Sequence, residues 1–133
     1  MVKTYKQGNV NSMEKKNPYK AERHQKGWGY EDWISNNAKY CGKLLLFKKG
    51  KKCSWHFHKI KDETFYLQSG KLIVRSGYDK DITKCNEVIL STGDCFYVPT
   101  TLIHQMEALE DSELFEFSTQ HFEEDSYRVT RGD

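Results

Sequence analysis

Residues 50–70 read GKKCSWHFHKIKDETFYLQSG, and two histidines in this stretch, His56 and His58, are the first indication of fold and chemistry. On a β-strand, side chains two positions apart point to the same face. His56 and His58 therefore project together, with Trp55 and Phe57 on the opposite face. Two imidazoles that converge in this way are half of a metal site.

Two further residues are placed to complete such a site. Glu63 shares its alternation with Phe65 and Leu67, so it points to the interior if those two side chains do. His104 lies at the centre of a later apolar segment, residues 102–106, and its side chain points to the same face as those of Leu102 and Met106, which we expect to be the interior. Three imidazoles and one carboxylate facing one interior suit Mn, Fe, Co, Ni or Zn. The alternative is that these histidines are hydrogen-bonded core residues or an exposed strand face.

The chain from residue 43 onward has the pattern of short β-strands separated by turns. The segments expected as strands are residues 44–47, 54–58, 64–67, 71–75, 87–90, 95–98, 102–106 and 113–117. Several of them end at turn residues, such as Ser69-Gly70. No stretch of this region has helical periodicity. Short strands at this spacing predict an all-β domain, either a sandwich, a barrel or a jelly roll.

The composition is that of one small folded domain. A chain of 133 residues suits a single domain, and 14% aromatic residues argue against disorder. A net charge of +2 provides no basic excess for binding nucleic acid. No apolar run approaches the roughly 20 residues of a membrane span. Residues 1–22 are polar and are expected to be a flexible tail, followed by one domain over residues 23–133.

The cysteines and the N-terminus predict a cytoplasmic protein. The first residues lack the apolar stretch of a secretory signal. None of the four cysteines is separated from another by two residues, which excludes zinc-knuckle and thioredoxin-type pairs. Four cysteines allow two disulfides, but in the cytoplasm we expect reduced and mostly buried thiols.

The spacing of these residues resembles the two signature motifs of the cupin superfamily. Residues 50–70 read G-x5-H-x-H-x4-E-x6-G, and residues 93–104 read G-x5-P-x4-H. The second motif departs from the pattern at Thr101 and Ala108, where cupins usually have Gly and Asn. The resemblance implies a double-stranded β-helix, or jelly roll, with a metal that has two open positions. Its implied ligands are His56, His58, Glu63 and His104. A metal-free cupin that retains the pattern is the alternative.

Other segments resemble type II mannose-6-phosphate isomerases. Residues 26–33, KGWGYEDW, are similar to the Pro-Trp-Gly entry segment of that family. Residues 43–50 and 54–58 look like its first barrel strands, and residues 116–121 with 124–128 resemble its acidic Asp-x-x-Arg ending. The chain is also similar to the cupin modules attached to some sialic-acid synthases.

These likenesses imply a metal-dependent enzyme that acts on a sugar or sugar phosphate, as an aldose–ketose isomerase. Such a reaction needs a metal to polarise the carbonyl oxygen and a base to move a proton. Glu116 is the first candidate for the base because it lies on the strand expected to close the barrel, residues 113–117. The sequence leaves open which of the two alternating sets of side chains on that strand faces inward. Lys61, His121 and Tyr66 are alternative bases, and the last two are also candidate substrate ligands.

A phosphorylated substrate would need a cationic partner. The candidates are Arg128, Lys59 and Lys61. The plainer alternatives are that Arg128 pairs with Asp125 on the surface and that both lysines are solvated in a charged turn.

Two other functions stay open at this point. One is an Fe or Mn cupin oxygenase, whose open metal positions bind O₂ and a chelating substrate. The other is a non-catalytic sugar-binding or sensory cupin. The expected partners are a small-molecule sugar or sugar phosphate and a second copy of the chain, with no nucleic acid and no membrane. Single jelly rolls commonly exchange edge strands, so we expect a homodimer with residues 23–40 as the swapped or docked segment.

Overall fold

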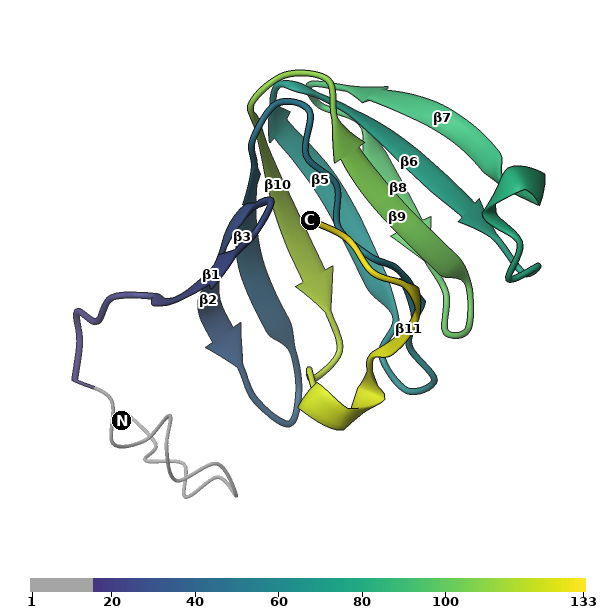
Figure 1. Ribbon diagram of the computed structural model, residues 1–133. Coiled ribbons are helices and arrows are strands. Elements are labelled where there is room, and N and C mark those ends of the chain that lie inside the picture. The colour runs from purple at the N-terminus through teal and green to yellow at the C-terminus, as the bar shows by residue number, and fades with distance from the viewer. Residues whose placement is uncertain (1–15) are drawn as a thin grey trace.

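Two antiparallel sheets face each other in the structure, a computed structural model that describes residues 16–133 (Figure 1). The strands of the larger sheet are, in spatial order, β1 (Glu22–Lys26), β2 (Gly29–Asn36), β3 (Cys41–Phe47), β10 (Ser112–Ser118), β5 (Glu63–Ser69) and β8 (Cys95–Val98). Those of the smaller sheet are β11 (Tyr127–Thr130), β4 (Trp55–Phe57), β9 (Ile103–Ala108), β6 (Lys71–Gly77) and β7 (Asn86–Ser91). Helix in the described region is limited to two short 3₁₀ turns, η1 (Ile82–Lys84) and η2 (Glu123–Asp125). The predicted jelly roll is confirmed.

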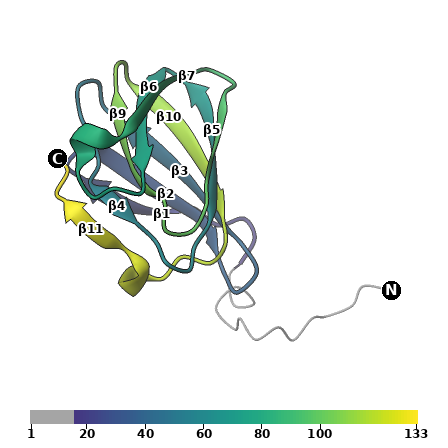
Figure 2. The same cartoon turned by 90° about the vertical axis from the view of Figure 1, so that its right-hand side faces the viewer.

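All eight segments expected as strands are strands, and three more strands were not predicted. β1 has the sequence ERHQK, which contains no apolar residue, and it pairs with β2 at the edge of the sheet. An ion pair of 2.7 Å between Arg23 and Asp32 links β1 to β2. β11 pairs with β4 and lies along the outer edge of the smaller sheet (Figure 2). With no apolar residue, β1 lacks the apolar alternation that reveals a strand in a sequence.

Residues 23–40, the expected swapped or docked segment, form most of β1 and β2. In the structure, β2 pairs with β3 of the same chain. The homodimer therefore stays a prediction. The expected tail falls partly on residues 1–15, which lie outside the described residues.

Along several strands, the side chains that face the interior are apolar at one end of the strand and polar at the other. The polar ends together form the candidate site. Apolar side chains pack at one end of the barrel; among them are Leu45, Phe47, Leu67, Leu72, Val74, Met106 and Leu114. At the other end the same strands carry buried polar residues, which are Lys43, Glu63, His104 and Glu116. The strand pattern that builds the core thus also directs polar groups into the interior.

All four cysteines are free. Cys41 and Cys53 are buried, whereas Cys95 is exposed. None of the helices in residues 16–133 is long and apolar enough to cross a membrane.

Candidate metal centre

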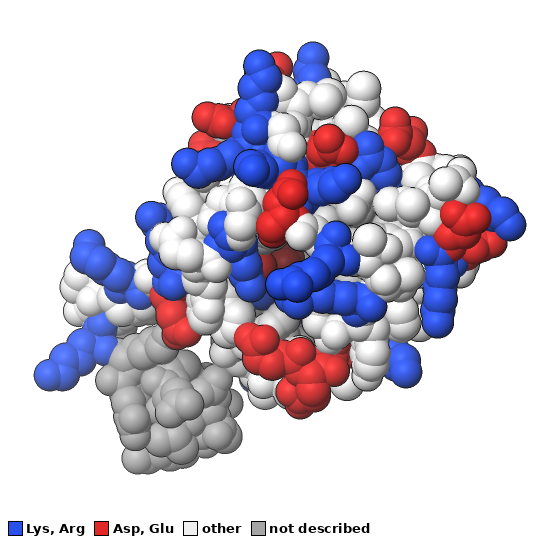
Figure 3. All heavy atoms as spheres, viewed as in Figure 1, with Lys and Arg blue, Asp and Glu red and all other residues white. Residues whose placement is uncertain are grey.

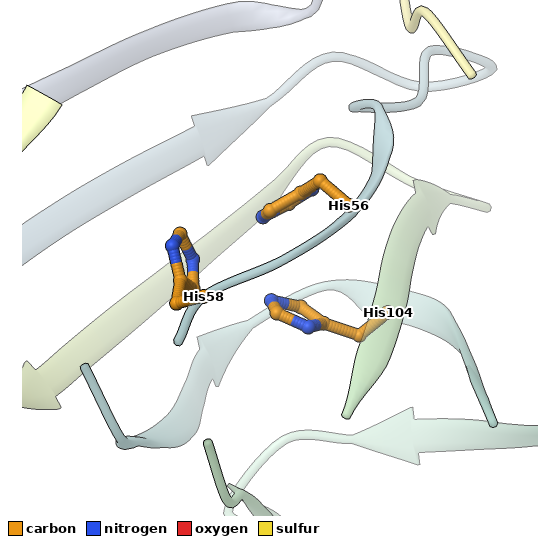
Figure 4. A group of neighbouring side chains, drawn as sticks. All are labelled: His56, His58 and His104. Carbon is orange, nitrogen blue, oxygen red and sulfur yellow. The ribbon is translucent and has the colours of Figure 1, made fainter. Parts of the chain in front are cut away.

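Three histidines meet inside the barrel, as their spacing predicted. His56 lies on β4 and His104 lies directly opposite it on β9, so their side chains share one face. His58 follows β4 immediately and points the same way. One ring nitrogen from each histidine lies within 4.8 Å of the other two, and Figure 4 shows the three imidazoles converging.

Hydrogen bonds to backbone carbonyls fix the orientation of all three rings. Because a carbonyl can only accept, each Nδ1 carries its proton, and each Nε2 keeps a free lone pair. For His56, His58 and His104 the acceptors are, in order, the carbonyl oxygens of Ser54 at 2.9 Å, Asp125 at 2.8 Å and Leu102 at 2.9 Å. Metal-binding histidines commonly have such a bond on their second nitrogen.

The charge state of the cluster also suits a cation. Burial lowers the pKa of His58 to about 4 and places that of His56 well below its ordinary value. These two imidazoles are therefore neutral near pH 7, which is the form that binds a metal.

Glu63 completes the donor set. Its Oε2 lies 3.1 Å from Nε2 of His104 and 3.7 Å from Nε2 of His58. Oε2 of Glu63 and Nε2 of His104 are both buried, and neither has a hydrogen-bond partner among residues 16–133. A buried polar atom without a partner is costly, and two such atoms side by side are the expected lining of a cation site. Three imidazoles and a carboxylate therefore fit a divalent transition metal.

Lys61 connects Glu63 to the second polar group of the site. Its Nζ lies 2.9 Å from Oε1 of Glu63 and 3.0 Å from Oε2 of Glu116, and it donates to Nδ1 of His121 at 3.3 Å. The alternative that this lysine is solvated in a turn is wrong, because it is only 3% exposed. The two carboxylates outweigh the burial penalty and raise the pKa of Lys61, so it stays protonated.

Glu116 and His121 surround this lysine. On β10, Leu114 and Glu116 face the interior, while Phe117 points outward and is 56% exposed. Burial and the nearby charge of Glu63 raise the pKa of Glu116. Burial, together with the charges of the neighbouring lysines, lowers the pKa of His121 to about 3, so this imidazole is neutral.

Asp125 holds the turn that carries Lys61. Its carboxylate accepts hydrogen bonds from the backbone amides of Lys59, Ile60 and Lys61, and its carbonyl accepts the one from His58. It is 2% exposed, so the expectation that it pairs with Arg128 on the surface is wrong. A single residue therefore positions both a histidine of the cluster and the buried lysine.

A cavity of about 690 Å³ joins these groups to the surface. In Figure 3 acidic atoms are recessed in a hollow near the centre of the face, with basic side chains around it. The predicted site residues that line the cavity are His56, His58, Lys61, Glu63, His104, Glu116, His121 and Arg128. Tyr66 does not line it, because it alternates with the buried Phe65 and Leu67 and lies on the opposite face of β5.

Sequence reasoning missed a third polar cluster on the cavity wall. Lys43 is buried, with its Nζ 3.4 Å from Oε1 of Glu31 and 4.5 Å from the centre of the Trp33 ring. The side chain of Lys43 points to the same face of β3 as those of Leu45 and Phe47. This alternation could have identified Lys43 as inward-facing.

Thr101, one of the two departures from the second cupin motif, occupies a turn just before β9. Its φ is 72°, in the left-handed region that favours glycine. Its amide donates to the carbonyl of His58 at 2.7 Å, so this turn is hydrogen-bonded to the segment that carries the histidine cluster.

Comparisons with solved structures agree with this architecture. The capsular polysaccharide assembling protein CapF from Staphylococcus aureus matches with a TM-score of 0.73 and 19% identity, over 84% of this chain and 35% of CapF. KdgF from Halomonas sp. matches with a TM-score of 0.66 and 19% identity, over 77% of this chain and 91% of KdgF. Oxalate decarboxylase from Bacillus subtilis matches with a TM-score of 0.71 and 20% identity, over 81% of this chain and 30% of the enzyme.

These likenesses are limited to the fold. The identities are low, and the chain spans only about a third of the length of CapF. No curated protein sequence matches the chain. A family model described as "Cupin domain" matches residues 43–117, which is more than half of the chain and includes all three clustered histidines and Glu63. The chain therefore belongs to the cupin family.

Proposed function

We propose that this cupin is a metal-dependent enzyme that interconverts an aldose and a ketose, with a sugar or sugar phosphate as its substrate. It would act in the manner of a type II mannose-6-phosphate isomerase. The observation that carries the proposal is Glu116, a buried carboxylate with a raised pKa in the same cavity as the histidine cluster. Lys61 connects it to Glu63.

The cluster supplies a site for a Lewis acid. A divalent metal held by Nε2 of the three histidines and Oε2 of Glu63 would polarise the carbonyl oxygen of the sugar. The backbone carbonyls that bind each Nδ1 keep the rings in the required orientation.

Glu116 is the base in this proposal. Its Oε2 accepts hydrogen bonds from Lys61 and from Ser118 at 2.8 Å. Within the described chain no hydrogen bond engages its other oxygen, Oε1, which is left to remove a proton from one carbon of the sugar and return it to the next. A raised pKa makes this carboxylate a stronger base than an ordinary glutamate.

The alternative bases are less suited to this role. Lys61 stays protonated because two carboxylates raise its pKa, so it orients Glu116 and Glu63 instead. His121 is neutral, but its Nδ1 lone pair already accepts from Lys61. Its position on the cavity wall instead suits a substrate contact.

The names of similar structures support a carbohydrate ligand only indirectly. CapF is described as a capsular polysaccharide assembling protein, and it shares the fold at 19% identity. The proposal therefore depends on the chemistry of the cavity.

The test is solvent hydrogen exchange during turnover. The chain is reconstituted with Mn, Fe, Co, Ni or Zn and incubated with fructose 6-phosphate, fructose or a ketopentose in D₂O. We expect an aldose product with deuterium at carbon 2, detected by NMR, and a loss of rate of roughly 100-fold or more for Glu116→Gln. Glu113→Gln, on the same strand, is the matched control, because Glu113 bonds to Ser69 instead of the cavity groups.

Two outcomes would contradict the isomerase. Oxygen consumption without isomerisation would favour a cupin oxygenase. Sugar binding without turnover or exchange, with any of the five metals, would favour a non-catalytic binding module.

A further inference from the structure

We infer that the cavity accepts a ligand with an anionic group, which Arg128 and Arg131 bind at its mouth beside the histidine cluster. The group is a phosphate or a carboxylate. The inference deepens the proposed function, since it rests on a sugar as the remainder of the ligand. It assigns a role to Arg128 and Arg131, two cavity residues that the metal chemistry does not use.

The register of β11 directs Arg128 toward the cluster. Arg128 lies directly opposite His56 in the antiparallel pair of β11 and β4. Residues directly opposite in such a pair project from the same face of the sheet. The side chain of His56 points into the cavity, so that of Arg128 does too, and both Arg128 and Arg131 line the cavity.

The buried cations deeper in the cavity already have acidic partners. Lys61 contacts Glu63 and Glu116. Lys43 lies 3.4 Å from Glu31. These lysines therefore have little capacity left for an anionic ligand.

The two arginines at the mouth of the cavity, in contrast, have no acidic partner in the described chain. No ion pair or side-chain hydrogen bond engages Arg128 or Arg131 anywhere in residues 16–133. The two acidic residues on the rim have other contacts: Asp133 accepts from the backbone amide of Lys52 at 2.9 Å, and Glu123 lies 3.7 Å from His121. Two guanidinium groups thus remain available next to a polar cavity.

Guanidinium chemistry determines what they would bind. The planar donor fork of arginine matches the oxygens of a phosphate or carboxylate, and such charge-assisted pairs are stronger than neutral hydrogen bonds. Figure 3 shows basic side chains around the hollow and acidic atoms within it. A ligand with its hydroxyl and carbonyl oxygens toward the cluster and its anionic group at the mouth complements both regions. The arrangement would also fix the direction in which a sugar enters.

The first experiment tests the anion site without any sugar. Metal-free protein is titrated with inorganic phosphate, and separately with acetate, while the side-chain Nε–H signals of arginine are followed by NMR. We expect one or both anions to shift the signals of Arg128 and Arg131, and Arg128→Gln or Arg131→Gln to weaken binding at least 5-fold. The control is Lys84→Gln, which removes a positive charge outside the cavity, where the Nζ of Lys84 lies 3.7 Å from Oδ2 of Asp79. Unshifted arginine signals, or equal affinity in the Arg128→Gln/Arg131→Gln double variant, would overturn the inference.

The second experiment separates this inference from the proposed function. Calorimetry on metal-loaded protein compares fructose 6-phosphate with fructose, and glucuronate with glucose. A gain of at least 10-fold for the phosphate or the carboxylate member identifies the anionic group, and this gain should disappear in the arginine variants. Equal binding of charged and neutral members would contradict the anion site. If no sugar binds but inorganic phosphate still shifts both arginines, the sugar function fails and the anion site stands.

Discussion

Nε2 of His104 and Oε2 of Glu63 lie 3.1 Å apart in the interior, and neither has a hydrogen-bond partner in the described chain. Together with the Nε2 lone pairs of His56 and His58, they form a site whose donors all lack protons. Each nearby Nδ1 proton is already used by a carbonyl. Metal binding is therefore the first property to test.

The purified protein should contain about one transition metal per chain, by the stoichiometry of a single four-donor site. Elemental analysis measures this directly. The double variant His56→Ala/His58→Ala should lose the metal, and addition of a chelator should lower the Tm of wild type but not of the variant. His24→Ala is the control, since His24 bonds to Glu22 and stacks on Trp33 outside the cluster. Absence of metal after reconstitution with all five candidates would rule out the metal centre.

Replacing Asp125 should weaken metal binding, because Asp125 holds His58 and the turn of residues 59–61 in place. Asp125→Asn keeps the size of the side chain but loses the charge that accepts three backbone amides. We expect a loss of metal affinity of about 10-fold or more, as for other residues that orient metal ligands. Competition with a chelator measures it in folded protein. Asp94→Asn is the matched control, because Asp94 accepts from the amide of Ser91 in a distant turn. Equal loss of affinity in both variants would contradict a positioning role.

Thr101→Gly should stabilise the protein. A β-branched residue at a φ of 72° is strained, whereas glycine adopts this conformation without a steric penalty. We expect the free energy of unfolding, measured with urea, to rise by about 1 kcal/mol. Thr100→Gly should lower it, since residue 100 has no such strain. A less stable Thr101→Gly would show that the threonine side chain contributes more than its strain costs.

The metal-free protein should lose stability as the pH falls below about 6.5. The folded-state pKa values of His58 and His121 are lowered to about 4 and about 3, so the unfolded chain binds protons before the folded chain does. Stability is then full above the unfolded pKa and is lost as pH falls toward these values. Each histidine contributes a slope of up to about 1.4 kcal/mol per pH unit. Urea titrations from pH 7 to pH 4.5 should show a shallower slope for His121→Gln. An unchanged slope would contradict the burial of a neutral His121.

The alternation of apolar and polar residues was sufficient to predict eight strands and the meeting of three histidines. This alternation could not show which face of β10 points to the interior, because the aromatic residues of β10 lie on its outer face. Phe115 and Phe117 stack there with ring centres 6.2 Å apart, while the charged Glu116 points inward. Hydrophobicity alone favours the opposite orientation.

The burial of Lys61 could not be predicted either, because it depends on a contact with no local signal. The turn that carries it is charged in sequence, and its amides are held by Asp125, 64 residues further along the chain. The position of Arg128 likewise depends on the pairing of β11 with β4, which places Arg128 opposite His56, a residue 72 positions earlier in the sequence.

The hydrogen bonds from Asp125 also bear on the order of folding. They join segments 64 to 67 residues apart, so their formation must follow the slow step of bringing distant parts of the chain together. A partly folded chain with only its hairpins in place would have the histidines but neither the fixed His58 ring nor the buried lysine. Metal capture should therefore occur late in folding, after the C-terminal segment has docked, and early intermediates should bind metal weakly.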